Sequence, residues 1–479
     1  MCWWHPGRMF HVVHLQRLDQ TERVVVLSPR TGRPRPMFFR AVPRASTDFP
    51  VPGGGANTSS RMVLLSSLAC SWLYSTLSKC DSKVLEAAYD ANHPDTNSLV
   101  ASSTSVILAA VGTAAAVPSP SSTATTDACY VTEYAAIPAA TAACTSITLD
   151  GLTVPGNSTI DLSKLKSGTK VTFKGKTFWE YADANYAFIK VGGSNIEITA
   201  DADAVLDGNG QAWWDGLGSN GGLTKPNHFI EISKVLGNSS VHDIYIENYP
   251  VHCFAISNSA GLDIHHITLN NSAGYAPNNR SNGLPASHNS DGFDLGSTND
   301  TTVRDSVVIN QDDCVAVTSG NNILVNNMYC NGSHGLSIGS VGGKSNNNVT
   351  NISFTNSVVL NAENGARIKS NSNTTGFISD ILFENIRVEN ISIYGIDIQQ
   401  DYLNGGPTGN PTNGVIIQNI AMRNITGTAT VEGKNYYILC GEGSCSNIKI
   451  DDVHITGGGL ESSCNFKTAG NFDCDGHFV

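Results

Sequence analysis

The stretch Asp243–Asn248, with the sequence DIYIEN, carries the pattern that decides the fold. Apolar side chains alternate with polar ones along it, and it ends in Asn, which is typical of a short strand followed by a turn. The pattern returns at irregular intervals of about 20 to 35 residues, so the chain contains a structural repeat. Further copies lie at Asn195–Ile198, Asp263–Asn270, Val307–Asn310, Ile323–Asn326, Ile352–Asn356, Ile381–Asn385, Val415–Asn419 and Ile448–Asp451.

A second kind of strand lies between these copies. It carries polar side chains, and a turn separates it from the apolar strand that ends in Asn, in the same order each time. This order predicts an all-β, single-domain fold, a right-handed parallel β-helix (β-solenoid) of about ten coils around a Val/Ile/Leu core. Asn side chains at equivalent turns are expected to hydrogen-bond from coil to coil. The polar strands are Cys253–Ile256, Gly292–Leu295, Gly335–Ile338, Ala366–Lys369 and Gly395–Ile398.

Other repetitive β folds fit this order less well. A leucine-rich repeat would show a stricter Leu spacing, and a propeller would show a regular blade length. A β-sandwich remains the structural alternative, although it explains the repeated strand-turn-strand order poorly.

The repeat is absent from the N-terminal part of the chain. Residues 1–126 hold 11 Lys/Arg and 7 Asp/Glu without apolar periodicity, so we expect a leader there (signal, propeptide or disordered segment) and a catalytic domain at 127–479. Within the leader, Met62–Leu77 and Val106–Val117 are too short for membrane spans. Val106–Val117 resembles the end of a signal peptide, and an Ala-rich linker is the other interpretation. No membrane association is expected.

The charge of the predicted domain limits its partners. Residues 127–479 carry 18 Lys/Arg against 34 Asp/Glu, which argues against binding to nucleic acid. An anionic substrate could bind only where a local cluster of cations overrides this acidic field.

The cysteines and the sequons indicate the compartment. Twelve cysteines with no Cys-x-x-Cys pair and no paired His spacing suggest disulfides rather than a metal site. About a dozen Asn-x-Ser/Thr sequons fit a glycoprotein. Together they predict a secreted, extracellular protein. Examples are the sequons at Asn238, Asn331, Asn348, Asn373 and Asn424.

Acidic residues and a histidine recur about once per coil beside the polar strands. Asp291, the pair Asp312-Asp313 and His334 should therefore line up along one groove. Because Asp312 and Asp313 are neighbours, both can reach the groove only if the chain bends or a strand ends there. Repulsion among three carboxylates raises the pKa of at least one, which can act as an acid while another acts as a base. Hydrolysis of a glycosidic bond requires this combination.

Two cations and aromatic residues extend the set. Arg367 and Lys369 are two apart on a predicted strand, so both face the same side, and they suit a sugar that bears carboxylates. Tyr402 and the pair Trp213-Trp214 offer aromatic surface for sugar rings, although the two tryptophans are more typical of packing.

Each of these motifs also has an ordinary interpretation. An Asp-Asp pair is often a solvated turn, a lone His is often structural, and an Arg-x-Lys segment is often an exposed strand face. Three Asp residues could also be calcium ligands. Order and context together favour a catalytic groove.

Four of these segments, in this order, resemble the signature segments of the polygalacturonases, glycosyl hydrolase family 28. They are Asn289–Asp294, Gln311–Cys314, Ser333–Gly335 and Arg367–Lys369. The similarity covers about residues 127–479, is closest to the compact fungal endopolygalacturonases, and departs from the usual pattern at Ser290 and Ser333. It extends to Asp207–Gly216, Lys225–Phe229, Gln399–Tyr402 and Cys440–Cys445.

The resemblance implies catalytic roles. Asp312 would be the general acid, and Asp291 and Asp313 would bind and activate the water, with inversion at the anomeric carbon. His334 would tune the acid or hydrogen-bond to it.

The resemblance also implies binding residues and disulfides. Arg367 and Lys369 would bind the galacturonate carboxylate, and Tyr402 would complete that subsite. The implied bridges are Cys129–Cys144, Cys314–Cys330, Cys440–Cys445 and Cys464–Cys474, which leaves Cys2, Cys70, Cys80 and Cys253 over.

The expected function is therefore that of a secreted, monomeric endopolygalacturonase that hydrolyses 1,4-α-D-galacturonosidic bonds of polygalacturonate (pectin) without a cofactor or metal. Alternatives in the same fold are exo-action and hydrolysis of rhamnogalacturonan or xylogalacturonan. A calcium-dependent pectate lyase and a non-catalytic β-helical binding protein are alternatives of other classes.

Overall fold

The computed structural model describes residues 128–404 and 406–475, together with five short strands between residues 4 and 36. The chain divides into two units, Met1–Val117 and Pro118–Val479. Apart from those short strands, the leader expected over residues 1–126 lies outside the described residues, and so do both of its apolar stretches and Cys2, Cys70 and Cys80. The first unit contains an antiparallel pair, β1 (Trp4–His5) and β2 (Arg8–Met9), and an antiparallel sheet of β3 (His11–Val13), β4 (Val25–Leu27) and β5 (Arg35–Pro36).

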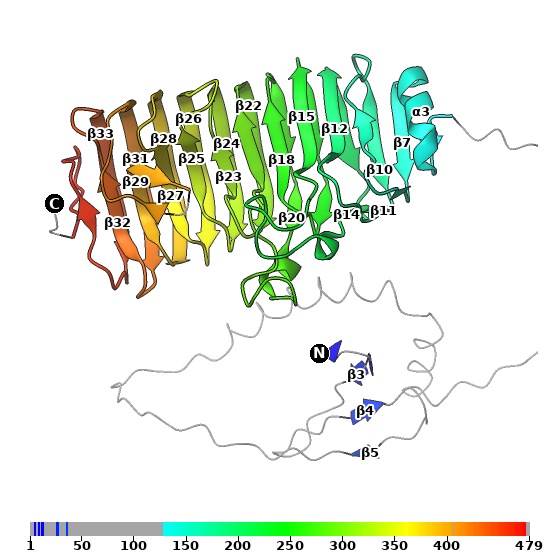
Figure 1. Ribbon diagram of the computed structural model, residues 1–479, viewed down its shortest axis with the longest axis horizontal. Coiled ribbons are helices and arrows are strands. Elements are labelled where there is room, and N and C mark those ends of the chain that lie inside the picture. Colours follow the sequence, from blue (N-terminus) through cyan, green and yellow to red (C-terminus); the bar gives the residue numbers. More distant parts are fainter. Residues whose placement is uncertain are drawn as a thin grey trace, which may run out of the picture. The chain divides into compact units, whose positions relative to one another are not determined.

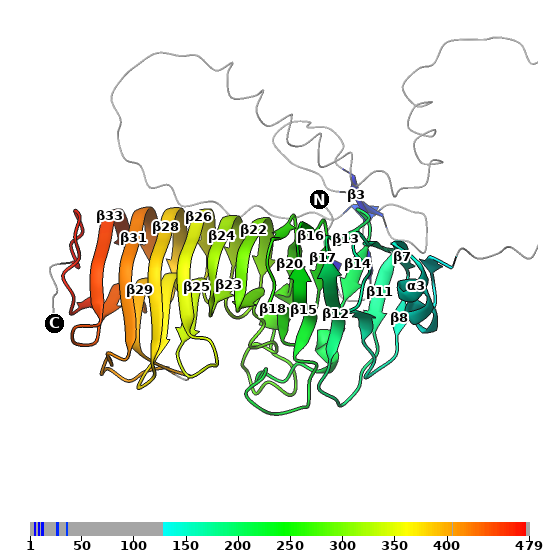
Figure 2. The ribbon, with the colours of Figure 1, turned by 90° about the horizontal axis from the view of Figure 1, so that it is seen from above.

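The second unit is a parallel β-helix, in which successive coils stack side by side from β7 to β33 (Figures 1 and 2). Among the described strands of this unit, β29 and β30 form the only antiparallel pair, and every other pair is parallel. This pairing confirms the predicted parallel β-helix and excludes the β-sandwich, whose sheets are antiparallel. No helix in the described part of the chain is long and apolar enough to cross a membrane.

A 12-stranded sheet contains the predicted polar strands and forms one side of the coils. Its strands follow the chain in order, so residues far apart in sequence become neighbours on adjacent strands. The strands are β9 (Ile160–Leu162), β12 (Ala187–Ser194), β15 (His228–Leu236), β18 (His252–Ser257), β21 (Phe293–Gly296), β23 (Val315–Val317), β25 (Leu336–Val341), β27 (Asn364–Asn371), β29 (Tyr394–Leu403), β32 (Lys434–Leu439) and β34 (Ser463–Cys464), with β30 (Gly406–Pro407) beside β29.

A 17-stranded sheet contains the apolar strands that end in Asn. In the first coils two short strands cover this part of the turn, and from β22 onward one long strand bends to do so. The strands are β6 (Tyr130–Val131), β7 (Ser146–Asp150), β8 (Thr153–Val154), β10 (Lys170–Lys174), β11 (Lys176–Trp179), β13 (Glu197–Ala200), β14 (Val205–Asp207), β16 (Ser239–His242), β17 (Tyr245–Glu247), β19 (Leu262–His265), β20 (Thr268–Asn270), β22 (Thr298–Ile309), β24 (Gly320–Asn331), β26 (Asn348–Leu360), β28 (Gly376–Ile391), β31 (Val415–Ala429) and β33 (Cys445–Thr456).

Apolar side chains at equivalent positions stack through the interior. Along the 12-stranded sheet, one such row places each side chain directly against those of the coils before and after it, and all of its members are completely buried. Each contributes about 1.5–3 kcal/mol from burial, so the row secures the register between coils. The row consists of Leu295, Val317, Ile338, Ile368, Ile398 and Ile438.

Asn residues form ladders at the bends, as the sequence predicts. Asn356, Asn385 and Asn424 all have positive φ, of 52°, 56° and 51°, which Asn tolerates better than other residues with a side chain. The Asn385 amide donates to Asn356 Oδ1 at 3.0 Å, and the Asn424 amide donates to Asn385 Oδ1 at 2.7 Å. The ladder therefore satisfies polar groups where each coil turns.

Short helices lie at one end of the stack and in loops beside it. α3 (Ile137–Ala143) follows η2 (Tyr134–Ala136) and buries Ile137 and Ala140 against the first coil (Figure 1). Covering this edge prevents the sheet from pairing with another chain. η3 (Gly210–Ala212) and η4 (Ser272–Tyr275) open the loops that follow β14 and β20.

Candidate active site

All seven predicted site residues line one groove of about 960 Å³. Asp291, Asp312, Asp313 and His334 lie in the bends directly before β21, β23 and β25, while the cations and Tyr402 lie on β27 and β29. These five strands are consecutive neighbours in the 12-stranded sheet, so the predicted row across the coils is what the structure contains. The members of the row are Asp291, Asp312, Asp313, His334, Arg367, Lys369 and Tyr402.

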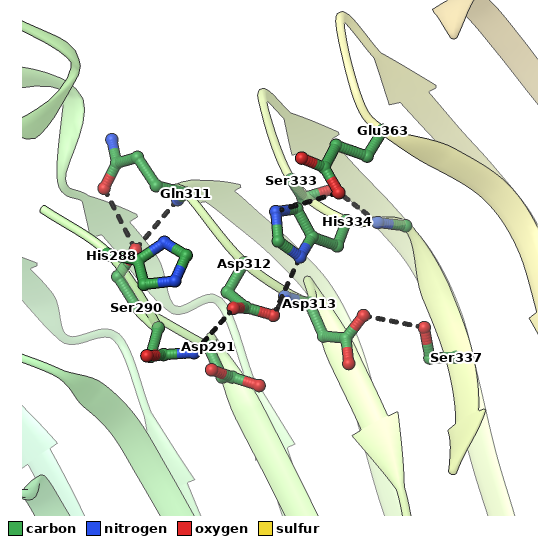
Figure 3. A network of polar contacts seen from close by, with 12 residues as sticks. His288, Ser290, Asp291, Gln311, Asp312, Asp313, Ser333, His334, Ser337 and Glu363 are labelled. Carbon is green, nitrogen blue, oxygen red and sulfur yellow. Dashed lines mark hydrogen bonds and ion pairs between the residues drawn. The ribbon is translucent and has the colours of Figure 1, made fainter. Parts of the chain in front are cut away.

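The chain bends at Asp312-Asp313, and this bend turns both carboxylates toward the groove (Figure 3). The Asp313 amide donates to Asp312 Oδ1 at 2.7 Å, and strand β23 begins only at Val315. The next residue, Cys314, is bonded to Cys330 on the neighbouring coil strand. The geometric condition that the sequence imposes on two adjacent acids is therefore met by ending the strand.

Asp313 is held by partners on both oxygens. Ser337 Oγ donates to Oδ1 at 2.8 Å, and Lys369 Nζ donates to Oδ2 at 2.7 Å. Only 2% of Asp313 is exposed. A buried carboxylate is stable in its ionised form when it is paired and hydrogen-bonded in this way, so Asp313 suits the role of a base.

The two cations lie side by side on β27, and the alternation of that strand points both into the groove while Ala366 and Ile368 enter the core. Each cationic group lies 5.4 Å from the centre of the Tyr402 ring. Arg367 Nε also donates to Asp397 Oδ2 at 3.2 Å. Burial raises the pKa of Asp397 to about 7, and the charge of Arg367 opposes that rise.

His334 connects the proposed acid to a further carboxylate (Figure 3). Its Nδ1 lies 3.1 Å from Asp312 Oδ1, and its Nε2 lies 3.3 Å from Glu363 Oε2. Burial acts to lower the pKa of His334, but the charges of Asp312 and Glu363 hold it well above its usual value. Burial likewise acts to raise the pKa of Asp312, but His334 and then Lys369 hold it below its usual range. These opposite shifts favour a protonated His334 beside an ionised Asp312.

Among the three predicted acids, Asp291 has a raised pKa. Burial raises the pKa of Asp291 to about 8, and the charges of Asp312 and Asp294 add to this effect. His252 opposes it, with Nδ1 3.0 Å from Asp291 Oδ1 and 3.1 Å from Asp294 Oδ2. The sequence predicts that repulsion raises the pKa of at least one of the three acids, and the surroundings in the structure raise it at Asp291 and lower it at Asp312.

Sequence reasoning assigned no role to four residues that touch the predicted set, although one of them, Asn289, lies in the signature segment Asn289–Asp294. Glu363 contacts His334, and His252 contacts Asp291. Asp397 accepts a hydrogen bond from Arg367, and the Asn289 amide donates to Asp312 Oδ2 at 3.2 Å. Asp397 carried a detectable signal, because it alternates with Ile396 and Ile398 on a strand whose other side is core. Glu363 and His252 lie in no recognisable motif, and only the pairing of coils brings them to the groove.

Trp213 and Trp214 do not contribute to the groove. They are 0% and 2% exposed, so the packing interpretation is correct. Trp213 Nε1 donates to Ala182 O at 2.8 Å and Trp214 Nε1 to Tyr249 O at 3.2 Å. Asn209 has φ of 52°, which places the segment before them in a turn.

Calcium is a poor fit for the three acids. One oxygen from each of Asp291, Asp312 and Asp313 lies within 4.8 Å of the others, a spacing that could surround a cation. However, Asp313 is already paired with Lys369 and Asp312 with His334. These positive partners compensate the carboxylates and would repel a divalent cation.

The structure contains the four disulfides that the resemblance implies: Cys129–Cys144, Cys314–Cys330, Cys440–Cys445 and Cys464–Cys474. Among the described cysteines, Cys253 is free, and it is buried in the core.

Comparisons with known proteins identify the family of the chain. The family model of the glycosyl hydrolases family 28 matches residues 144–472. The chain is 54% identical to a probable endopolygalacturonase D of Emericella nidulans, over 71% of this chain and 66% of that one. It is 53% identical to a polygalacturonase of Fusarium fujikuroi, over 71% of this chain and 92% of that one.

A solved structure has a similar fold. Endopolygalacturonase I of Stereum purpureum, in complex with two galacturonates, aligns with a TM-score of 0.60 and 28% identity, over 71% of this chain and 96% of that one. Because the family model matches more than half of the chain and the Fusarium fujikuroi relative is 53% identical, the chain belongs to the glycosyl hydrolases family 28.

Proposed function

We propose that the protein is a secreted endopolygalacturonase that hydrolyses 1,4-α-D-galacturonosidic bonds of polygalacturonate. The observation that carries this proposal is the placement of Arg367 and Lys369 in the same groove as three carboxylates. Two buried cations stabilise a uronate carboxylate, and the carboxylates supply the acid and the base of glycoside hydrolysis. The names of the relatives, which include endopolygalacturonases, support the endo mode.

Recognition of the substrate starts at the cations. A galacturonate carboxylate can accept hydrogen bonds from the Arg367 fork and from Lys369, and the Tyr402 ring covers the sugar on that side. Because the rest of the domain is acidic, an anionic polymer gains binding energy only at this local cluster. The sugar ring is thereby fixed with its glycosidic bond above the acids.

Substrate binding can also move the proton to Asp312. In the free site the charges of His334 and Lys369 keep the pKa of Asp312 low. A substrate carboxylate on Lys369 neutralises part of that field and excludes water, and both changes raise the pKa of Asp312. His334, which is protonated and 3.1 Å away, then shares its proton with Asp312, and Asp312 donates to the leaving oxygen.

The water is activated on the other side of the bond. Asp313, which accepts a hydrogen bond from Lys369, and Asp291 both face the groove and can hold one water between them. Attack by that water would invert the anomeric carbon. Inverting enzymes usually separate their carboxyl groups by about 6.5–9.5 Å, whereas single oxygens of these three acids lie within 4.8 Å of one another. The configuration of the first product, followed by nuclear magnetic resonance, is therefore a direct test, and retention would contradict the proposal.

The same proposal places the mature enzyme outside the cell as a monomer, with residues 1–126 as its leader. Four disulfides support an oxidising compartment. Product sizes after brief digestion of polygalacturonate test the endo mode. Mixed oligomers are expected, and release of monomer alone would contradict it.

A further inference from the structure

Asp397 lies on β29 beside one of the two cations of the groove. It is paired in register with Arg367 on β27 and with Tyr437 on β32 (Figure 1). Because its two neighbours on the strand enter the core, the alternation of β29 turns Asp397 to the same side of the sheet as Arg367. Asp397 is nevertheless completely buried, and it is not among the described residues that line the groove. It can therefore act on a ligand only through a lining residue such as Arg367.

The carboxylate of Asp397 is only half paired. Its Oδ2 accepts a hydrogen bond from Arg367 Nε at 3.2 Å, whereas its Oδ1 has no hydrogen-bond partner in the described part of the chain. A buried carboxylate with one unpaired oxygen lowers the stability of a fold, and an apolar residue at this position would avoid that cost. Such an unsatisfied group in contact with a binding residue points to a role in binding rather than in folding.

Asp397 also decides how the guanidinium of Arg367 is presented to the groove. Nε donates to Asp397, and Nη2 donates to Gln399 Oε1 at 3.4 Å. Nη1 lies 4.0 Å from Asp313 Oδ1, so Asp397 is the closer of the two carboxylates that pair with Arg367 in the described chain. Because a guanidinium is planar, fixing Nε also fixes the directions in which Nη1 and Nη2 can donate to a substrate carboxylate.

The charge of Asp397 depends on the groups around it. Burial raises the pKa of Asp397 to about 7; two cations oppose this rise, and a neighbouring carboxylate adds to it. Two tyrosine hydroxyls also face Asp397, and their own pKa values are raised, so both stay neutral near pH 7. The charge of Asp397 therefore changes close to neutral pH. The facing groups are Arg367 and Lys369 from β27, Asp401 and Tyr394 from β29, and Tyr437 from β32.

We propose that Asp397 is a positioning residue that orients Arg367 for the substrate carboxylate and competes with that carboxylate for the charge of Arg367. This inference rests on the proposed function and extends it to the control of affinity. An ionised Asp397 neutralises part of the charge that attracts a galacturonate, whereas a protonated Asp397 leaves that charge to the substrate. In both forms an oxygen of Asp397 can accept from Nε, so the orientation of Arg367 is kept.

The competition makes affinity depend on pH. The carboxylates of polygalacturonate ionise at a much lower pH than Asp397, so their charge is constant from pH 6 to pH 8. The groove should therefore bind polygalacturonate more tightly at pH 6 than at pH 8.

The test measures KM and kcat for polygalacturonate at pH 6 and pH 8 with the full chain. Asp397→Asn keeps an acceptor for Arg367 Nε but carries no charge at either pH. The ratio of KM at pH 8 to KM at pH 6 should be larger in wild type than in Asp397→Asn by about fivefold or more. The kcat values of the two enzymes should agree within about twofold at each pH, because a change in binding alone leaves kcat unaltered.

Two further variants separate orientation, charge and stability. Asp397→Leu removes the acceptor as well as the charge, so it should raise KM by about tenfold at both pH values, and Asp397→Asn should restore the wild-type KM at pH 6. Asp207→Asn is the matched control, because Asp207 is 8% exposed, pairs with Lys176 at 2.7 Å and does not line the groove. It should leave the wild-type ratio of the two KM values unchanged.

The outcomes separate the two proposals. If wild type does not cleave polygalacturonate, the proposed function is wrong. If wild type cleaves it but the ratio of KM values is the same in Asp397→Asn, or if Asp397→Asn raises KM as much as Asp397→Leu, the inference about Asp397 alone is overturned. A wild-type KM that does not rise between pH 6 and pH 8 overturns it as well, and that result does not depend on the folding of any variant.

Discussion

Lys369→Met removes one charge from the groove and keeps a long apolar side chain in its place. Lys369 Nζ lies 2.7 Å from Asp313 Oδ2, and only 8% of the side chain is exposed. A hydrogen bond between a buried ammonium and a substrate carboxylate contributes about 1.5–3 kcal/mol, so its loss should raise KM for polygalacturonate by about tenfold to a hundredfold. We also expect kcat to fall, because Asp313 loses the hydrogen bond from Lys369 that holds its carboxylate in place for the water.

The same substitution should lower stability. Asp313 would keep Ser337 and the more distant Arg367, at 4.0 Å, so a buried charge would lose its main partner. Breaking such a pair costs about 3–5 kcal/mol, which circular dichroism would detect as a lower Tm.

Lys170→Met is the matched control, because the Lys170–Glu197 pair has side chains that are 48% and 37% exposed. That change should cost less than about 1 kcal/mol and leave KM unaltered. KM is obtained from the release of reducing ends across a range of substrate concentrations. A Lys369→Met enzyme with KM within about threefold of wild type would refute carboxylate recognition by this cation.

Three further predictions concern the proton, the histidine and the coils. The pKa of Asp291 rises from 3.8 to about 8 on folding, so the folded state loses stability as the pH rises through that window. The Tm of Asp291→Asn should therefore rise relative to that of wild type between pH 4 and pH 8. A difference in Tm that is the same at pH 4 and at pH 8 would contradict this. Glu363 raises the pKa of His334, so Glu363→Gln should shift the alkaline limb of the kcat/KM profile against pH to lower pH. An alkaline limb at the same pH in the variant would exclude this role of Glu363. Asn385→Ala removes two ladder hydrogen bonds at a residue with φ of 56° and should lower the free energy of unfolding by about 1–3 kcal/mol. Asn385→Gly should lose less stability, because Gly tolerates that backbone conformation. Equal losses in the two variants would argue against backbone strain at this position.

The fold could be predicted because its repeat is local and periodic. Strand alternation followed by Asn marks each coil, and the ladder of Asn356, Asn385 and Asn424 is where that signal predicts hydrogen bonds between coils. The row of reactive residues follows from the same repeat, since stacking places equivalent positions side by side. The loops after β14 and β20 lie outside the repeat, so the contact between them, in which Gly216 N donates to Ala286 O, had no sequence signal.

The protonation states could not be predicted for a different reason. The sequence shows three acids that cannot all ionise freely, but their environments decide which one carries the proton. His252 reaches Asp291 from β18 and Glu363 reaches His334 from a later coil, and neither contact has a motif. A residue that acts through such a neighbour becomes visible only in three dimensions.

The most direct test of the central claim is digestion of polygalacturonate by wild type and by Asp312→Asn, with reducing ends and unsaturated uronate measured together. The account predicts reducing ends without unsaturated product, unaffected by a chelator, and a loss of about 10²–10⁴-fold in kcat for Asp312→Asn. Formation of unsaturated uronate, loss of activity in a chelator, or an Asp312→Asn enzyme as active as wild type would contradict hydrolysis by these carboxylates.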